Sequence, residues 1–144
     1  ARPAPAQPVA RPAPQASTPG SGASREDMLA EALDSRIGNA PDVQAVSLVS
    51  LVGFTMASAL PPDMQEDRVG AMSAAILGLG ERAAAELGRG ALSQVYIEGE
   101  DGYVVLMSAG GRAVLTALAD ADAKLGLIMY DMRSTAARIA EILG

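Results

Sequence analysis

Two glycine-rich stretches have letters that could serve nucleotide chemistry. GLGERA (Gly78 to Ala83) matches the G-x-G-x-x-A dinucleotide fingerprint, which requires a strand ending directly before it and a helix opening at it. Here the stretch lies inside a long helical pattern, so we interpret the match as accidental. GRGALS (Gly88 to Ser93) follows a predicted helix and enters a predicted strand, which is the wrong order, and the chain has no P-loop motif. The sequence therefore predicts no nucleotide site of its own.

Acidic side chains gather at two turns. Glu98, Glu100 and Asp101 surround a hairpin turn, but a calcium site would need more oxygen ligands at defined spacing. Asp120 and Asp122 precede the last helix, where capping and turn roles suffice. The chain has no histidine and no cysteine, which removes the commonest general base, the commonest metal ligand and all thiolate chemistry. We therefore predict no enzyme activity, no metal and no cofactor.

Residues 1–24 differ in composition from the rest of the chain. They hold six of the nine prolines, no acidic residue and almost no bulky apolar side chain. Such a segment cannot bury enough surface to offset its chain entropy. We expect a Pro/Ala-rich disordered linker at 1–24 that led to another domain, since no starting Met is present, and one folded domain at 25–144.

The remaining residues are acidic, with nine basic against seventeen acidic side chains and a net charge of −8. With few aromatic residues and no basic stripe, this predicts no nucleic-acid binding. No apolar run reaches the roughly 18 residues of a membrane span, so we expect no membrane insertion. The absence of cysteine fits a cytoplasmic location.

Hydrophobic periodicity predicts eight elements in the order α-β-β-α-β-β-β-α. The predicted helices are 26–38, 63–88 and 123–142, and the predicted strands are 43–50, 54–60, 92–98, 103–109 and 113–119. Short links between neighbouring strands favour an antiparallel sheet with helices on both faces, an α+β sandwich. The turn Leu51-Val52-Gly53 lacks the polar residue that usually precedes glycine in a hairpin, so either something covers this tip or the site is unusual.

The helix at 63–88 is the main functional candidate, because the side expected to face solvent carries glycine and alanine where charged residues would be expected. At 100° per residue, one predicted stripe faces the sheet: Val69, Met72, Ile76, Leu79, Ala83 and Leu87. The opposite side includes Gly70, Ala74 and Gly78, four residues apart. Glycine inside a helix costs about 1 kcal/mol relative to alanine, and small residues let two backbones approach closely. We expect this side to meet a second copy across a two-fold axis; the alternative is a composition rich in small residues everywhere.

In the order of its predicted elements and in its residue pattern, the segment 25–144 resembles the roadblock family, named for a dynein light chain. Prokaryotic members of this family include MglB-like regulators of Ras-like GTPases. Most similar is Gln94 to Met132, QVYIEGEDGYVVLMSAGGRAVLTALADADAKLGLIMYDM, with the LG that opens the last helix. GFTMASALP resembles the second strand, and EDRVGAMSAAILGLGERAAAELG the Ala-rich second helix. Members usually have Asp-Gly where this chain has Val52-Gly53, so it departs from the pattern at that turn.

The resemblance implies a roadblock/longin-like homodimer. Its five-stranded antiparallel sheet would carry the second helix on one face and the first and third on the other, with second helices meeting and third strands pairing edge to edge. It implies that a small GTPase docks near the second helix. Some relatives accelerate the hydrolysis of GTP by that GTPase without supplying an arginine finger. The candidate dimer-interface residues are Gly70, Ala71, Ala74, Gly78, Glu81, Ala85, Gln94 and Tyr96. The candidate partner-binding residues are Asp67, Arg68, Ala71, Ser73, Ala74 and Glu81.

Three hypotheses follow. The first is a non-enzymatic homodimeric regulator or scaffold for a small Ras-like GTPase. The second is a dimerisation module that joins tethered signalling domains. The third is a profilin-like or PAS-like small-molecule-binding domain with a pocket around Met56, Met107 and Met129, although methionines more often fill cores.

Overall fold

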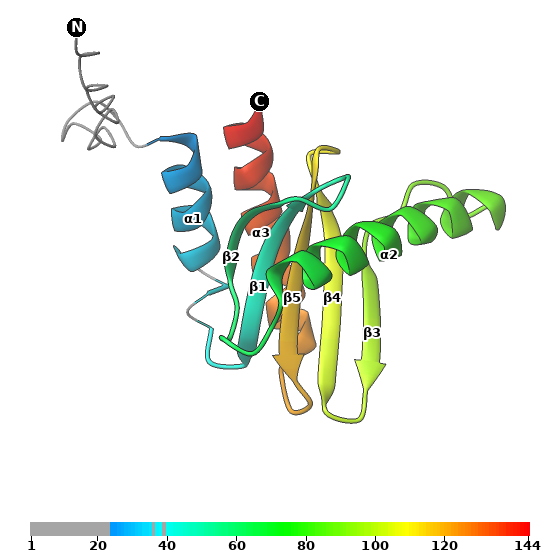
Figure 1. Cartoon of the computed structure of the whole chain (residues 1–144). Coiled ribbons are helices and arrows are strands. Elements are labelled where there is room, and N and C mark those ends of the chain that lie inside the picture. Colours follow the sequence, from blue (N-terminus) through cyan, green and yellow to red (C-terminus); the bar gives the residue numbers. More distant parts are fainter. Residues whose placement is uncertain (1–23, 36, 39) are drawn as a thin grey trace, which may run out of the picture.

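The computed structural model describes residues 24–35, 37–38 and 40–144, and within them the chain forms three helices and five strands (Figure 1). Residues 1–23 of the expected linker lie outside the described residues. The elements are α1 (Arg25–Ser35), β1 (Val43–Ser50), β2 (Thr55–Ala59), α2 (Glu66–Glu86), β3 (Val95–Gly99), β4 (Gly102–Ala109), β5 (Ala113–Asp120) and α3 (Leu125–Leu143). The predicted order of elements is confirmed.

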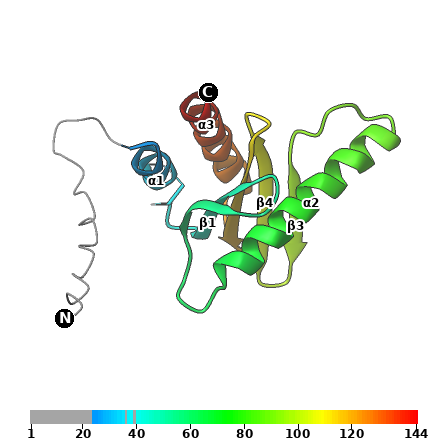
Figure 2. The same ribbon diagram turned by 45° about the horizontal axis from the view of Figure 1, so that its top comes forward.

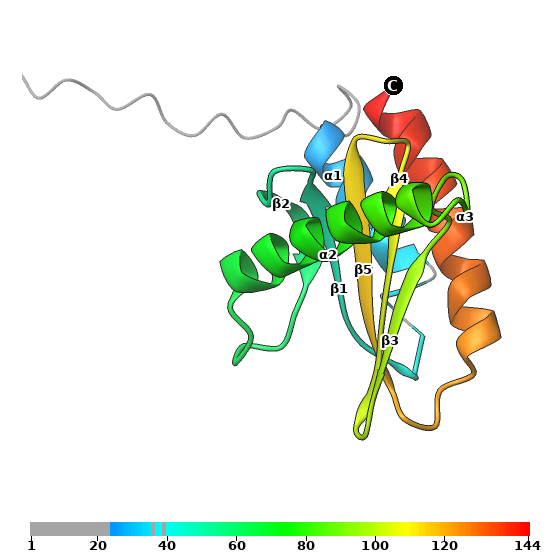
Figure 3. The ribbon, with the colours of Figure 1, turned by 90° about the vertical axis from the view of Figure 1, so that its right-hand side faces the viewer.

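All five strands belong to one antiparallel sheet in the order β2-β1-β5-β4-β3. α1 and α3 cover one face of this sheet, and α2 crosses the other (Figures 1 and 3). β5 lies in the middle and is buried along nearly its whole length, which explains its continuous apolar sequence. The predicted α+β sandwich is therefore confirmed, with β2 and β3 at its two edges.

The main core lies between the sheet and the pair α1 and α3. Leu48 and Leu115 of the sheet meet Met132 and Ile139 of α3 there, and all four side chains are fully buried. The apolar spacing in the sequence of this helix predicts that Met132, Thr135 and Ile139 face the core, together with Leu127 or Ile128 and with Ile142 or Leu143. The structure buries Met132, Thr135 and Ile139, and of the two alternatives it buries Ile128 and Leu143. The helix buries this stripe because its apolar residues recur at intervals of three and four.

The predicted orientation of α2 is only partly right. Of the stripe expected to face the sheet, Val69 and Ile76 are half-buried and line the groove beside the sheet together with Met72. Leu79 and Leu87 do not face the sheet; the side chains of Met72, Leu79 and Leu87 are 54%, 67% and 72% exposed. The residues of α2 buried against the sheet are Gly70, Ser73 and Leu77. In a helix rich in alanine and glycine, the small residues permit close approach to the sheet, and several of the larger ones point outward.

Two glycines of α2 show why the helix turns this way. A Cβ atom at Gly70 would lie 2.5 Å from the carbonyl oxygen of Gly53 in the β1–β2 turn. A Cβ atom at Gly80 would lie 2.9 Å from Val95 of β3. Gly78, by contrast, has no neighbouring atom within 4 Å of such a position. Gly70 is therefore packed against the hairpin turn while Gly78 faces open space, so the two glycines do not form one exposed ridge.

The C-terminal part of α2 projects beyond the β3 edge of the sheet (Figures 1 and 2). From Glu81 to Leu87 every residue except the half-buried Ala84 is exposed. The end of the longest helix therefore has little of its own chain to pack against.

Candidate protein-interaction surface

The outer face of α2 is formed by Ala71, Met72, Ala75, Gly78 and Leu79, all of which are exposed. Met72 lies at the margin of this face, where it also lines the groove beside the sheet. The face combines small residues with two large apolar side chains. Exposed apolar residues that lie side by side on one element are typical of an interaction surface. The helix therefore carries a strip of exposed apolar side chains with few charged residues within it.

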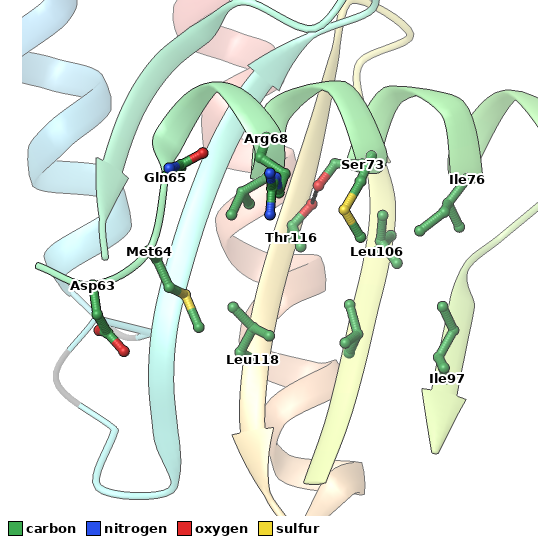
Figure 4. A pocket seen from close by; sticks show the side chains of 13 residues that line it. Asp63, Met64, Gln65, Arg68, Ser73, Ile76, Ile97, Leu106, Thr116 and Leu118 are labelled. Carbon is green, nitrogen blue, oxygen red and sulfur yellow. Dashed lines mark hydrogen bonds between the residues drawn. The ribbon is translucent and has the colours of Figure 1, made fainter. Parts of the chain in front are cut away.

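An open groove of about 550 Å³ runs between α2 and the sheet (Figure 4). Its walls are mostly apolar and come from α2, β3, β4 and β5, while Asp63, Gln65 and Arg68 lie at one end. The lining residues are Asp63, Met64, Gln65, Arg68, Val69, Met72, Ser73, Ile76, Ile97, Val104, Leu106, Thr116 and Leu118. α2 contacts all five strands as it crosses the sheet, but it covers only part of their length, so the groove beside it is left open (Figure 3).

A pair of hydroxyl groups lies inside the groove. Thr116 Oγ1 donates a hydrogen bond of 2.8 Å to Ser73 Oγ, and both side chains are 3% exposed. The pair satisfies polar atoms that would otherwise be buried without a partner. It joins the middle of α2 to the central strand and so fixes the position of the helix over the sheet.

The edge strand β3 is the second exposed feature on this side. It pairs with β4 alone within the described residues, which leaves its outer edge free to pair with another strand. Tyr96 and Ile97 on this strand are exposed. Gln94, just before the strand, donates a hydrogen bond of 3.0 Å to the sulfur of Met129 in α3.

The structure divides the predicted site residues into two groups. The exposed ones are Asp67, Arg68, Ala71, Gly78, Glu81, Ala85 and Tyr96. The others are turned inward to different degrees: Gly70 and Ser73 are buried, and Ala74 and Gln94 are half-buried. Ser73, expected as a partner contact, is buried in the single chain and its hydroxyl accepts the hydrogen bond from Thr116. The expected ridge of Gly70, Ala74 and Gly78 is wrong, because Gly70 packs against Gly53.

The sequence interpretation missed Met72, Ala75 and Leu79 as surface residues. A signal was present in the helical glycines, because a glycine that is seated against another backbone marks the packed side of a helix. Gly70 and Gly80 both point toward the sheet. Taken as the packed side, they would have placed Met72 and Leu79 outside.

The pocket predicted around three methionines is also wrong. Met107 is buried in the core on the α1 and α3 face, and Met56 and Met129 pack against that same core. Among the described residues, no cluster of three or more Asp, Glu, His or Cys side chains is placed to hold a metal ion. Within the same residues, no helix has the length and apolar character needed to cross a bilayer.

Comparison with known proteins agrees with this architecture. The model of the Roadblock/LC7 domain family matches residues 29–119. An uncharacterised protein of Methanocaldococcus jannaschii is 40% identical over 97 residues, which cover 67% of this chain and 84% of that protein.

Two solved structures have the same fold. Myxococcus xanthus MglB superposes with a TM-score of 0.76 at 18% identity, covering 85% of this chain and 92% of that one. A Roadblock/LC7 domain from Streptomyces avermitilis superposes with a TM-score of 0.70 at 25% identity, covering 81% and 96%. On the family match, the curated relative and the shared fold, this chain belongs to the Roadblock/LC7 domain family.

Proposed function

We propose that this chain is a non-enzymatic, homodimeric, cytoplasmic regulator or scaffold for a small Ras-like GTPase, with residues 25–144 as its domain and 1–24 as a linker. The observation that carries the proposal is the exposed apolar outer face of α2, with Met72 and Leu79 uncovered. The proposal has two steps, a dimer and a docking surface.

Three features of the α2 side complement one another across a two-fold axis. β3 has a free edge, α2 projects past that edge, and an apolar groove lies on the sheet beside α2. If two copies pair through β3, the projecting end of each α2 lies over the groove of the other. A two-fold axis repeats each contact twice, so one geometry covers both grooves and both edges.

The dimer would also bury side chains that are costly to leave in water. Leu79 and Leu87 are mostly exposed in the single chain. Fully burying a leucine side chain contributes about 1.5–3 kcal/mol, and each contributes twice in a symmetric pair. Edge pairing would satisfy the free backbone groups of β3 at the same time.

The docking surface would be the part of α2 that stays exposed in the dimer. Asp67 and Ala71 are exposed outside the groove and are the candidate contacts that the dimer leaves open, and MglB shares the fold. Arg68, which borders the groove, and Glu81, in the projecting end of α2, are also exposed in the single chain and would lie at the margin between the dimer contact and the docking surface. The chain enters α1 close to the end of α3, where the side chains of Arg25 and Arg112 donate hydrogen bonds of 3.5 Å and 3.1 Å to the carbonyl of Leu143. Both helices lie on the opposite face of the sheet from α2 (Figure 1), so this entry point leaves the docking surface clear.

The test is a binding titration of the full chain against the small Ras-like GTPases of its source organism. Each GTPase is loaded with GDP or with a non-hydrolysable GTP analogue, and binding is measured by calorimetry. The proposal predicts binding to one nucleotide state of one GTPase. If every GTPase in both states failed to bind a chain shown to be dimeric, the regulator proposal would be abandoned.

The groove favours a second candidate, a small-molecule-binding domain. A volume of about 550 Å³ with apolar walls and the Ser73–Thr116 hydroxyl pair suits an apolar ligand with one polar group. A dimer would cover this groove, so the two candidates make opposite predictions. A ligand that binds only the dissociated chain would favour the small-molecule hypothesis; a dimer that binds no GTPase would favour a simple dimerisation module.

A further inference from the structure

The β1–β2 turn exposes large apolar residues at the end of a hairpin. Val52 is 79% exposed and Phe54, the only phenylalanine of the chain, is 74% exposed. Leu51 beside them is half exposed. A surface turn needs no such residues for folding, and polar residues are preferred there.

The backbone of this turn is held in one shape. The amide of Ser50 donates a hydrogen bond of 2.8 Å to the carbonyl of Phe54, and the amide of Gly53 donates one of 3.0 Å to the carbonyl of Ser50. The amide of Phe54 donates a further one of 3.0 Å to Ser50 Oγ. Gly53 takes a positive φ of 96°, which side chains with a Cβ rarely adopt. The aromatic ring is therefore presented from an ordered turn.

α2 supports the turn directly (Figure 2). A Cβ atom on Gly53 would lie 3.4 Å from the Cα of Ala71, and Gly70 has no room for a Cβ under the Gly53 carbonyl. The tip and the first half of the outer face of α2 therefore form one surface. A rigid aromatic side chain on such a support loses little entropy on binding, which is the property of an interface anchor.

The charges beside this surface are mostly negative. Asp67 lies one helical turn before Ala71 on the same side of α2, and Asp63, Glu66 and Asp67 outnumber Arg68 around the helix start. Charge complementarity then requires basic side chains on the partner near the point where Phe54 docks.

We propose that Phe54 and Val52 anchor the partner protein, inserting into an apolar recess that is rimmed by basic side chains, while Ala71 and Asp67 contact its margin. The inference rests on the proposed function, because the partner is taken to be the small Ras-like GTPase. It goes further by moving the anchor of that interface from α2 to the hairpin tip.

The experiment compares three versions of the full chain in surface plasmon resonance against the GTPase found in the titration above. F54A should weaken binding by about 30-fold, as the loss of an interface anchor does. D67K should mainly slow association and weaken its salt dependence. Y130A is the matched control, because Tyr130 is a 62% exposed aromatic residue of α3 on the far face, and it should leave affinity within about twofold.

Each result decides the inference. Unchanged binding by F54A and by a second variant, V52S, would overturn the tip as anchor while leaving the regulator proposal intact. Loss of the dimer in F54A, seen as a fall in molar mass, would overturn it too, by assigning the tip to the second copy. If the unmodified chain bound no GTPase, both proposals would fall together. Should F54A fold poorly by circular dichroism, the binding of V52S decides instead, since the Val52 side chain is still more exposed.

Discussion

On one face of the sheet, α1 and α3 together enclose a core in which Leu48, Leu115, Met132 and Ile139 are completely buried. On the other face, α2 alone buries a small cluster of Leu77, Leu106 and Val114 and leaves the groove beside it open. The same strands supply both faces, so the difference comes from the helices. One face is completed within the chain, and the other is left open along the groove.

This comparison changes the role assigned to the small residues of α2, some of which pack the helix against its own sheet and hairpin turn. Gly70 and Gly80 allow the helix to approach its own sheet and hairpin, and Gly78 is the one turned outward among these three. The larger apolar residues, Met72 and Leu79, are exposed on the same helix. An interface built from this side would therefore use side-chain burial, with only Gly78 offering close backbone approach.

The largest effect should come from the completed face. M132A removes a fully buried side chain of α3 and should destabilise the fold by about 2–5 kcal/mol. I76A, at a half-buried position of α2, should cost less. Urea denaturation at one fixed chain concentration measures both. Equal losses would contradict the division into a complete and an incomplete face.

The next effect concerns the open face. L79E places a charge on the outer face of α2 and should weaken the dimer by about a hundredfold, or about 2.7 kcal/mol, while the circular dichroism spectrum stays unchanged. L127E is the control, because Leu127 is similarly exposed on α3. Sedimentation velocity measures the fraction of dimer in each variant. A dimer that tolerates L79E would place the interface elsewhere.

A smaller effect is expected at the packed glycine of α2. G70A puts a methyl group 2.5 Å from the Gly53 carbonyl, and this overpacking should cost about 1–3 kcal/mol as helix and turn move apart. The measurement is the shift in the thermal unfolding midpoint. A gain in stability would mean that Gly70 does not seat the hairpin tip.

The smallest effect should have the opposite sign. G78A adds a methyl group where no atom lies within 4 Å, so the gain in helix propensity should stabilise the folded chain by about 1 kcal/mol. The same thermal unfolding measurement checks it, at a concentration low enough to dissociate the dimer. A loss of stability there would contradict the outward orientation of this residue.

The sequence predicted the order of the elements and the inward side of α3, because both depend on strong local patterns. The periodic large residues of α3 leave one choice of face, and Met132 and Ile139 are buried as predicted. The side of α2 could not be predicted in the same way. Alanine and glycine give a helix little amphipathic contrast, so the contact between Gly70 and the distant turn at Gly53 decides its orientation.

The exposed tip is marked in the sequence by the apolar residues at its turn, but its place beside α2 was not predictable. That position depends on the β1–β2 hairpin ending where α2 crosses the sheet, and only the assembled fold brings these two segments together. The replacement of the family's usual Asp-Gly by Val52-Gly53 could therefore be interpreted only once the structure showed that this turn lies against Ala71 of α2.

The central claim is that the α2 face is completed by a second copy. The most direct test is the molar mass of the full chain in solution, measured by multi-angle light scattering over a concentration series. The series runs from about 1 to about 100 micromolar, so that it brackets the dissociation constant of a dimer of moderate affinity. We expect twice the mass of one chain at the upper concentrations, falling toward one chain on dilution or in L79E. A single-chain mass at every concentration would contradict the claim.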